Sequence, residues 1–116
     1  MTIPDMAMNA IWSKKIDSIL SFGVPLDCVG IRNWALGRND APRAIGELEA
    51  LGVPILGGDV YKLVDGAVEQ TYDNWYCDKK YEESVSLFLR ESSDRARDYI
   101  FNYSNGAALF AIVPKY

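Results

Sequence analysis

Hydrophobic residues recur with the spacing of an α-helix in three stretches of the chain. The spacing predicts helices over about residues 5 or 9 to 22, 39 or 40 to 51, and 81 to 103. Gly23 and Gly52 follow the first two stretches, and glycine in that position favours a left-handed residue that ends a helix. Asn39 or Asp40 is expected to cap the second helix, because either side chain can accept from its free N–H groups. Pro42 then lies in the first turn, where its missing donor costs little.

Each helix is expected to bury one apolar face. For the first helix that face comprises Met8, Trp12, Ile16, Ile19 and Leu20. For the third helix it comprises Tyr81, Val85, Phe88, Leu89, Ala96, Tyr99, Ile100 and Tyr103, and the solvated remainder comprises Arg90, Glu91, Asp94, Arg95, Arg97 and Asp98. Leu87 and Phe101 point away from the third apolar face. Isolated exposed apolar residues are common, whereas a joint patch would indicate an oligomer or partner surface.

A β-hairpin is the clearest short-range prediction. The β-prone residues 53–64 and 68–77 flank Asp65-Gly66, and this dipeptide favours a type I′ turn, which needs positive φ at both central residues. In the resulting register Val64 pairs with Ala67, and Lys62 faces Glu69 as an opposite-charge cross-strand pair.

The same register places Gly57 and Gly58 opposite Asp73 and Asn74. Two residues without side chains then face two polar ones, so either a β-bulge lies there or another group approaches the backbone closely. The segment ILGGDVY around the glycines lacks the spacing of a phosphate-binding loop, and no lysine follows it at the required distance. A twisted or bulged strand and a ligand contact through the exposed backbone both remain open.

The segment TYDNWYC (residues 71–77) carries three aromatic side chains. Tyr72 and Tyr76 would share one face of the strand and Trp75 the other, so either both faces are covered or one presents an aromatic surface. Oxygen ligands for a cation, or an acid/base pair, could come from Asp59, Asp73 and Asp78. The spacing matches no EF-hand, and the register places Asp59 and Asp73 on opposite faces, so we expect no metal.

The final strand is predicted over residues 107–113, which are apolar on both faces, as in a central strand. Residues 26–36 are expected to be irregular, or a short strand around 28–31, with Val29, Ile31 and Trp34 against the core. The element order is α-α-β-β-α-β. We therefore expect an α+β fold over residues 1–116 as one domain, with a small sheet built from the hairpin and the C-terminal strand and packed by helices.

Composition and charge exclude several classes of function. The 116 residues include no histidine and two cysteines, and their net charge is −4. A Ser-His-Asp triad, an imidazole metal site and a structural zinc site of four N/S ligands are excluded, and an acidic chain is a poor binder of nucleic-acid backbone. No signal peptide and no apolar run near a membrane span occurs, so we expect a cytoplasmic protein. Cys28 and Cys77 could pair, but buried free thiols are the simpler expectation.

Two motifs, PILGGDVY (residues 54–61) and TYDNWYC (71–77), resemble the immunity protein 40 family of bacterial polymorphic toxin systems. The resemblance extends to NWAL (33–36), ESVSLFLRESSDRARDYI (83–100) and LFAIV (109–113), and so covers about residues 30–113 in order. One departure is GRNDAP (37–42), where similar proteins often carry a Ser/Thr cap and acidic residues, so only the start of the second helix is in question.

The resemblance implies a non-enzymatic protein without a cofactor that binds and neutralises a cognate toxin domain. The positions that it implicates as characteristic of the family are Gly57, Gly58, Asp59, Tyr61, Asp73, Asn74 and Trp75. We predict partner contacts from Asp59, Tyr61, Asp73, Asn74 and Trp75, and structural roles for Trp34, Gly57, Gly58, Asp65 and Gly66. The alternatives are a small-molecule or peptide-binding module that uses Gly57-Gly58 and nearby aromatics, or a small hydrolase with Asp59 or Asp73 as base.

Overall fold

The computed structural model describes residues 10–116, which form a five-stranded antiparallel sheet and confirm the α+β class. The strands are β1 (Val24–Pro25), β2 (Trp34–Gly37), β3 (Ile55–Val64), β4 (Ala67–Tyr76) and β5 (Leu109–Pro114). Their spatial order is β1-β2-β5-β3-β4, so the C-terminal strand lies inside the sheet and β4 forms one edge. The central position predicted for the last strand is confirmed, because Phe110, Ala111 and Ile112 are all buried.

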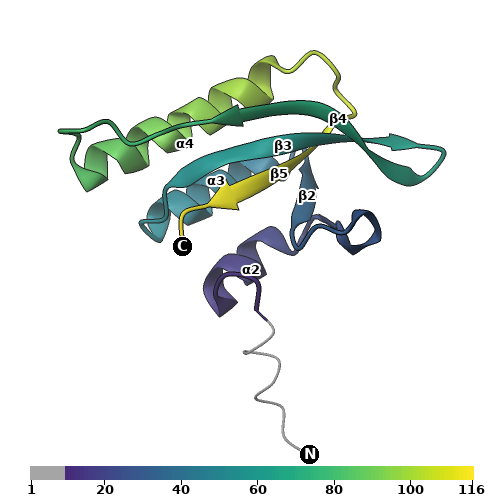
Figure 1. Cartoon of the computed structure of the whole chain (residues 1–116), viewed down its shortest axis with the longest axis horizontal. Coiled ribbons are helices and arrows are strands. Elements are labelled where there is room, and N and C mark those ends of the chain that lie inside the picture. Colours follow the sequence, from purple (N-terminus) through teal and green to yellow (C-terminus); the bar gives the residue numbers. More distant parts are fainter. Residues whose placement is uncertain (1–9) are drawn as a thin grey trace, which may run out of the picture.

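Three helices accompany the sheet in the described residues: α2 (Lys14–Leu20), α3 (Ala41–Ala50) and α4 (Val85–Asn102). Figure 1 shows α3 and α4 together behind β3, β4 and β5, with α2 below β2. The opposite side of the sheet, which we call the open face, carries no helix from the described part of the chain apart from the one-turn η1 (Asp27–Val29).

Helix α2 begins at Lys14, and residues 10–13 are not helical although the predicted helix includes them. The part of that prediction before residue 10 lies outside the described residues. Ser13 is the N-cap of α2 and accepts a hydrogen bond from the Ile16 N–H at 3.1 Å. The Asp17 carboxylate accepts from the N–H groups of Ile11 and Trp12, which holds the preceding chain out of the helix. Ile16 is buried as expected, together with Ile19 and Leu20. The expected contribution of Met8 lies outside the described residues.

The other two helices show how capping sets a boundary. Asp40 is the N-cap of α3, as predicted, but its side chain makes no capping hydrogen bond, and Gly52 follows the helix with a φ of +78°. Helix α4 begins at Val85, not near residue 81, because the Ser84 hydroxyl accepts from the Leu87 N–H at 3.1 Å. Tyr81 and Val85 are consequently exposed, and their assignment to the apolar face is wrong.

The segment between α2 and α3 was predicted least well. The strand expected around residues 28–31 is the 3-10 turn η1, and the strand β2 comes later, at Trp34–Gly37. Val29 and Ile31 are exposed, whereas Leu26 is fully buried. Strands of two and four residues are too short for a periodicity to reveal them.

The hairpin forms with the predicted turn, and its register is correct for four residue pairs. Asp65 and Gly66 have φ values of 52° and 82°, both positive as a type I′ turn requires. The pairs from Val64↔Ala67 to Tyr61↔Gln70 match the prediction. Beyond them the register shifts, and the pairs are Asp59↔Asn74, Gly58↔Trp75 and Gly57↔Tyr76.

The shift results from a bulge in β4, on the strand opposite the glycines. Residues 71–73 lie across from Val60 alone, Tyr72 has a φ of 69°, and the Thr71 hydroxyl donates to the Val60 carbonyl at 2.8 Å. The predicted pairing of Gly58 with Asp73 is therefore wrong by two positions. Because side chains alternate with period two, a shift of two positions keeps Asn74 and Trp75 on their predicted faces. A second irregularity, between Ile55 and Gly57 in the pairing with β5, places Ile55 in the core beside Val60 and leaves Leu56 exposed, so the predicted faces of these two residues are wrong.

The core divides between the two faces of the sheet. Between the sheet and the helices lie Ile55, Val60, Phe110 and Ile112, packed with the buried residues of α2, α3 and α4. A smaller cluster on the open face consists of Leu26, Ala35, Tyr61 and Ala111. The open face is thus covered near Leu26. It is uncovered where β3 begins and β5 ends, around Leu56 and Val113.

Candidate functional site

The two glycines of β3 make room for Trp75 of β4. A Cβ added to Gly58 would overlap the Trp75 ring and would lie 2.7 Å from the carbonyl oxygen of Ala111. A Cβ added to Gly57, whose φ is 157°, would overlap the Trp75 carbonyl oxygen. The close approach predicted at the glycine pair is therefore real, and the group that approaches is the neighbouring strand with its indole ring.

Trp75 begins a row of aromatic rings that joins β4 to α4. The rings of Trp75 and Tyr99 stack with their centroids 4.8 Å apart, and Tyr103 follows at 5.9 Å from Tyr99. Tyr103 meets Phe110 edge-on at 5.7 Å, which ties the row to the core. Trp75 is only 5% exposed, so this predicted contact residue packs inside the fold.

Asp73 lies at the end of this row, on the helix side of the sheet. Its carboxylate accepts a hydrogen bond from the Tyr103 hydroxyl at 2.6 Å and is otherwise exposed. That hydrogen bond is the main reason why the pKa of Tyr103 is raised. Burial raises the pKa of Tyr99, with a smaller contribution from the charge of Asp73. Both tyrosines therefore remain neutral beside the carboxylate at physiological pH.

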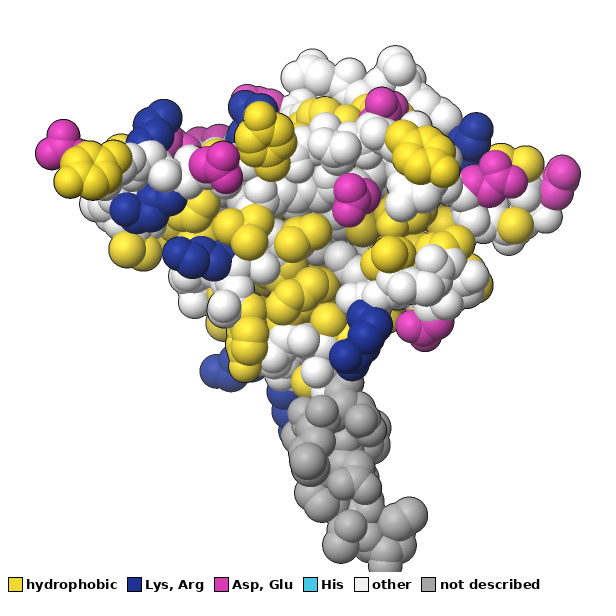
Figure 2. All heavy atoms as spheres, viewed as in Figure 1, with side chains coloured by type: hydrophobic (Ala, Val, Ile, Leu, Met, Phe, Trp, Pro, Cys, Tyr) yellow, Lys and Arg dark blue, Asp and Glu magenta, His cyan; other side chains and the backbone are white. Residues whose placement is uncertain are grey.

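Asp59 and Asn74 form a cross-strand pair on the open face, so Asp59 and Asp73 lie on opposite faces as predicted. Together with Leu56 and Val113 they line a shallow hollow of about 210 Å³ over the glycine pair. Burial raises the pKa of Asp59, whose carboxyl is half-buried among apolar neighbours. Figure 2 shows this face, with hydrophobic side chains gathered over its middle and single acidic side chains among them.

The remaining predicted residues lie apart from the hollow. Tyr61 is 1% exposed, and its hydroxyl accepts from the Gln70 amide at 3.1 Å. Trp34 packs against the main core from β2, and the adjacent Asn33 side chain donates to the Ile112 carbonyl at 3.0 Å. The turn formed by Asp65-Gly66 lies at the far end of the hairpin.

A groove along α4 was missed because its charged residues were assigned to the solvated face of the helix and its tyrosines to the apolar face. This feature, the α4 groove, has a volume of about 740 Å³. It is lined by the carboxylates of Glu91, Asp94 and Asp98, by the guanidinium of Arg95, and by the rings of Tyr99 and Tyr103. A combination of acidic side chains at i, i+3 and i+7 with tyrosines on the same side of the helix was the available sequence signal.

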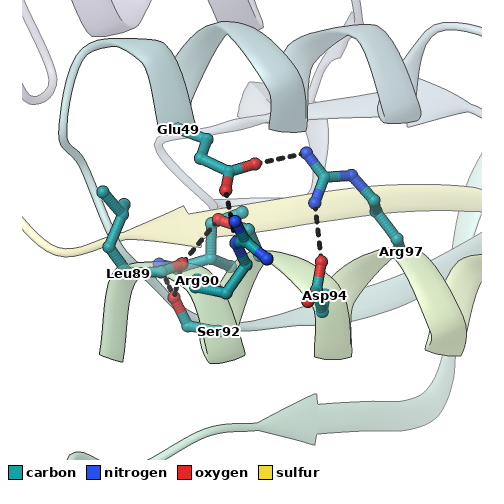
Figure 3. Close-up of polar contacts among 8 residues, drawn as sticks. Glu49, Leu89, Arg90, Ser92, Asp94 and Arg97 are labelled. Carbon is teal, nitrogen blue, oxygen red and sulfur yellow. Dashed lines mark hydrogen bonds and ion pairs between the residues drawn. The ribbon is translucent and has the colours of Figure 1, made fainter. Parts of the chain in front are cut away.

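The arginines of α4 are held by partners within the protein. Glu49 of α3 lies 2.5 Å from Arg97 and 3.8 Å from Arg90, and Arg97 also reaches Asp94 at 3.0 Å (Figure 3). Arg95 donates from Nε to the Tyr76 carbonyl of β4 at 2.6 Å. The positive charges of α4 are thus bound to α3, β4 and Asp94.

Arg38, which follows β2, binds the C-terminal end of α4. Its guanidinium donates to the carbonyls of Phe101, Tyr103 and Asn105, the first at 3.0 Å and the last at 3.2 Å. These carbonyls lie at or beyond the end of a helix that has no basic residue in its own last turn. One side chain from a distant segment therefore caps α4 and fixes the position of Tyr103.

Residues 10–116 contain no group of three or more Cys, Asp or Glu side chains placed to hold a metal ion. In the same range no helix is long and apolar enough to cross a membrane. Both cysteines are free thiols; Cys77 is partly buried, but Cys28 is exposed, contrary to its expected burial. Leu87 and Phe101 are exposed, as predicted.

The comparisons with known proteins agree with the resemblance found in the sequence. A search of curated proteins and a search of solved structures each found no match. The sequence model of the family described as Immunity protein 40 matches residues 25–114, which include β2, the whole hairpin, α4 and nearly all of the sheet. The chain therefore belongs to the immunity protein 40 family.

Proposed function

We propose that this protein binds a cognate bacterial polymorphic toxin in the cytoplasm and neutralises it as a stoichiometric, non-catalytic inhibitor. Membership of the immunity protein 40 family is the observation that carries the proposal. No cofactor is needed for inhibition of this kind, since occupying the active site or substrate surface of the toxin is sufficient.

We place the contact surface at the base of the hairpin and on the adjacent side of α4. Asp73 and Asn74 are exposed and Asp59 is half-exposed, so all three can reach a partner. Tyr61 and Trp75 are buried, and we propose that they support this surface from beneath. Exposed rings that could add contact area are Tyr72 and Tyr76, at 83% and 65% exposure.

The acidic balance of the chain supports a basic partner. A net charge of −4 would attract a toxin with a basic cleft, such as a nuclease, and would act mainly on the association rate. Raising the salt concentration should therefore slow association while leaving dissociation nearly unchanged. An association rate that does not respond to salt would remove the electrostatic contribution from the proposal.

The deciding experiment is co-expression with the toxin domain encoded by the neighbouring gene. Growth should be rescued by the wild-type protein, and the two chains should co-purify in a defined ratio. Failure of both rescue and co-purification would overturn the proposal. Rescue that is insensitive to Asp73→Ala would retain the function and move the contact surface elsewhere.

A ligand-binding module is the second candidate, and it would use the hollow over Gly57 and Gly58. Its volume of about 210 Å³ is smaller than the roughly 300–1,000 Å³ of most small-molecule sites. The hollow therefore suits one side chain of a protein partner better than a free metabolite. A metabolite screen by thermal shift that found a saturable ligand would reverse this ranking.

A further inference from the structure

Asp59 places a carboxylate in the interior of the open face, among neighbours that carry no charge. Strand β3 lies between β5 and β4, and Asp59 pairs with Ala111 on one side and with Asn74 on the other. The surrounding positions on the same face are Gly57, Tyr61, Leu109, Val113, Gln70 and Tyr76. None of these neighbours is charged, and within residues 10–116 the Asp59 side chain forms no hydrogen bond or ion pair.

This position is unfavourable for a carboxylate without a partner. Burial raises the pKa of Asp59, and among the described residues no positive charge or hydrogen bond acts in the opposite direction. No helix of the described residues covers this part of the open face (Figure 1), so the carboxylate is half-buried and still reachable from outside. An ion pair at such a partly desolvated position is stronger than one in water. Asp59 can therefore gain from a cation that the fold itself does not supply.

The hollow beside Asp59 has the size and the lining for one side chain. Its volume is about 210 Å³, and it lies where Gly57 adds no side chain to the open face. Leu56 and Val113 line it with apolar groups, and Leu56 is 41% exposed. The ring of Trp75 packs with the core on the helix side of the sheet, so no aromatic ring forms the floor of the hollow.

Among protein side chains, lysine matches this combination. Its four-carbon stem can lie along the apolar lining while its ammonium reaches the Asp59 carboxylate and the amide oxygen of Asn74. Arginine matches less well, because its planar guanidinium gains from stacking on a ring, and the hollow offers none. The lone carboxylate suits a compact point charge, which is the form of the lysine ammonium.

We propose that the hollow beside Asp59 binds one lysine side chain of the toxin. In the complex the ammonium pairs with the Asp59 carboxylate and donates to the Asn74 side chain, and the aliphatic stem covers Leu56 and Val113. The identity of the occupant rests on the proposed function, whereas the unpaired carboxylate and its fit to an ammonium rest on this chain alone.

The fit to an ammonium is tested without any toxin. Asn74→Lys places an ammonium across from Asp59 on the open face, and an opposite-charge cross-strand pair should raise the Tm by about 2–4 °C. The same substitution in the Asp59→Asn background should give no such gain, and Asn74→Gln, which adds length without charge, should give none in either background. An equal Tm shift from Asn74→Lys in both backgrounds would show that Asp59 does not accept an ammonium and would overturn the proposal.

The occupant is tested in the complex with the toxin domain. A carbodiimide joins a carboxylate to an amine in direct contact, with loss of water, and does not join it to a guanidinium. Mass spectrometry should find the peptide that contains Asp59 joined to one lysine of the toxin, and Asp59→Asn should lose that cross-link. Cross-links from other carboxylates only, or from Asp59 to a second copy of this chain, would overturn the lysine site.

Affinity measurements give the weight of this contact. The Kd of the complex should rise about tenfold or more in Asp59→Asn and stay unchanged in Glu47→Gln, which removes one charge from an exposed position on α3. Replacement of the cross-linked toxin lysine by methionine should weaken binding to a similar extent and add no further loss to Asp59→Asn.

The outcomes separate the contact from the function. Equal affinity of Asp59→Asn and the wild type would overturn the lysine site and leave the proposed function standing. A loss of affinity without a cross-link to a lysine would also overturn the lysine site, and would indicate an arginine in its place. If the wild type does not bind the toxin, the proposed function and the occupant both fail, and the Tm measurements separately uphold or overturn the fit of Asp59 to an ammonium.

Discussion

The base of the hairpin and the α4 groove lie on neighbouring parts of the molecule and differ in almost every physical respect. At the base of the hairpin, Gly58, Trp75 and their neighbours form a close-packed junction in which an added methyl group would overlap another atom. In the α4 groove, Asp94 and Asp98 stand exposed beside an open volume, and only Asp94 has an ion-pair partner, Arg97.

This difference teaches that a distinctive motif and a binding surface need not coincide. The residues that make the sequence recognisable, GGD and DNW, combine a packing device with a few exposed polar groups. The groove residues occur in a polar stretch with no recognisable motif. Only the folded structure shows that they line one groove with Tyr99 and Tyr103. Substitutions should therefore separate the two regions: changes in the junction should unfold the protein, and changes in the groove should alter binding.

The largest effect is expected from Trp75→Ala. Removal of a buried ring that fills the space over Gly58 and stacks on Tyr99 should lower the free energy of unfolding by about 3–5 kcal/mol. Urea denaturation followed by circular dichroism measures the change, and Trp75→Phe, which keeps an aromatic ring, should lose markedly less. A midpoint for Trp75→Ala close to that of the wild type would show that the junction does not hold the hairpin against α4.

The next effect is expected from Gly58→Ala, paired with Gly46→Ala as its control. The new methyl group at Gly58 meets the Trp75 ring, and overpacking of this kind costs about 1–3 kcal/mol. Gly46 lies in α3 with no atom within 4 Å of an added Cβ, so alanine there should stabilise the helix by about 0.5–1 kcal/mol. Thermal unfolding measures the Tm of both variants, which should fall for Gly58→Ala and rise for Gly46→Ala. Tm shifts of the same sign would contradict the argument.

A smaller effect, of opposite sign, is expected in the groove. Asp98→Asn removes the repulsion between Asp98 and Asp94 and also removes an unfavourable negative charge near the C-terminal end of α4. The free energy of unfolding should therefore rise by about 0.5 kcal/mol. Calorimetry at low salt should detect the gain, and high salt should reduce it because exposed charges are screened. If Asp98→Asn destabilised the protein instead, the carboxylate would serve the fold, and the contrast with the junction would be lost.

The smallest effect concerns Asp59 and depends on pH. Because burial raises its pKa above the ordinary 3.8, the folded state holds this proton more tightly than the unfolded state. The resulting stabilisation is complete below the unfolded pKa and is lost as the pH rises through the folded pKa. The Asp59→Asn variant does not lose this stabilisation. The free energy of unfolding of the variant, relative to that of the wild type, should therefore increase from about pH 3 to pH 6. Parallel stability curves for the two proteins across that range would contradict the assignment.

The sequence predicted well wherever local chemistry decides the conformation. The turn at Asp65-Gly66, the register as far as Tyr61 and Gln70, and the end of α3 just before Gly52 follow from backbone preferences of a few neighbouring residues. The apolar run of the last strand likewise predicted a central position, because a strand buried on both faces has few polar residues.

The same reasoning failed where a distant segment decides. At the bulge of residues 71–73, the Thr71 hydroxyl donates to the Val60 carbonyl and the Asp73 carboxylate accepts from the Tyr103 hydroxyl. No local pattern in the sequence of β4 indicates either partner. The short strands β1 and β2 exist only because each pairs with a neighbouring strand. Capping by Ser84 also overrode an apolar pattern that appeared to begin at Tyr81.

By itself, the sequence determined the α+β class, the hairpin with its turn, the three helical stretches and the family of the chain. Only the tertiary structure decided that Gly57 and Gly58 face Trp75, that Asp59 and Asn74 share the open face, and that Asp73 joins Tyr103. It also decided that Glu49 holds Arg90 and Arg97, which leaves Asp98 without a partner among the described residues. The physical reason is range: turns, caps and periodicity act over a few residues, whereas packing and charge pairing depend on which distant residues the fold brings together.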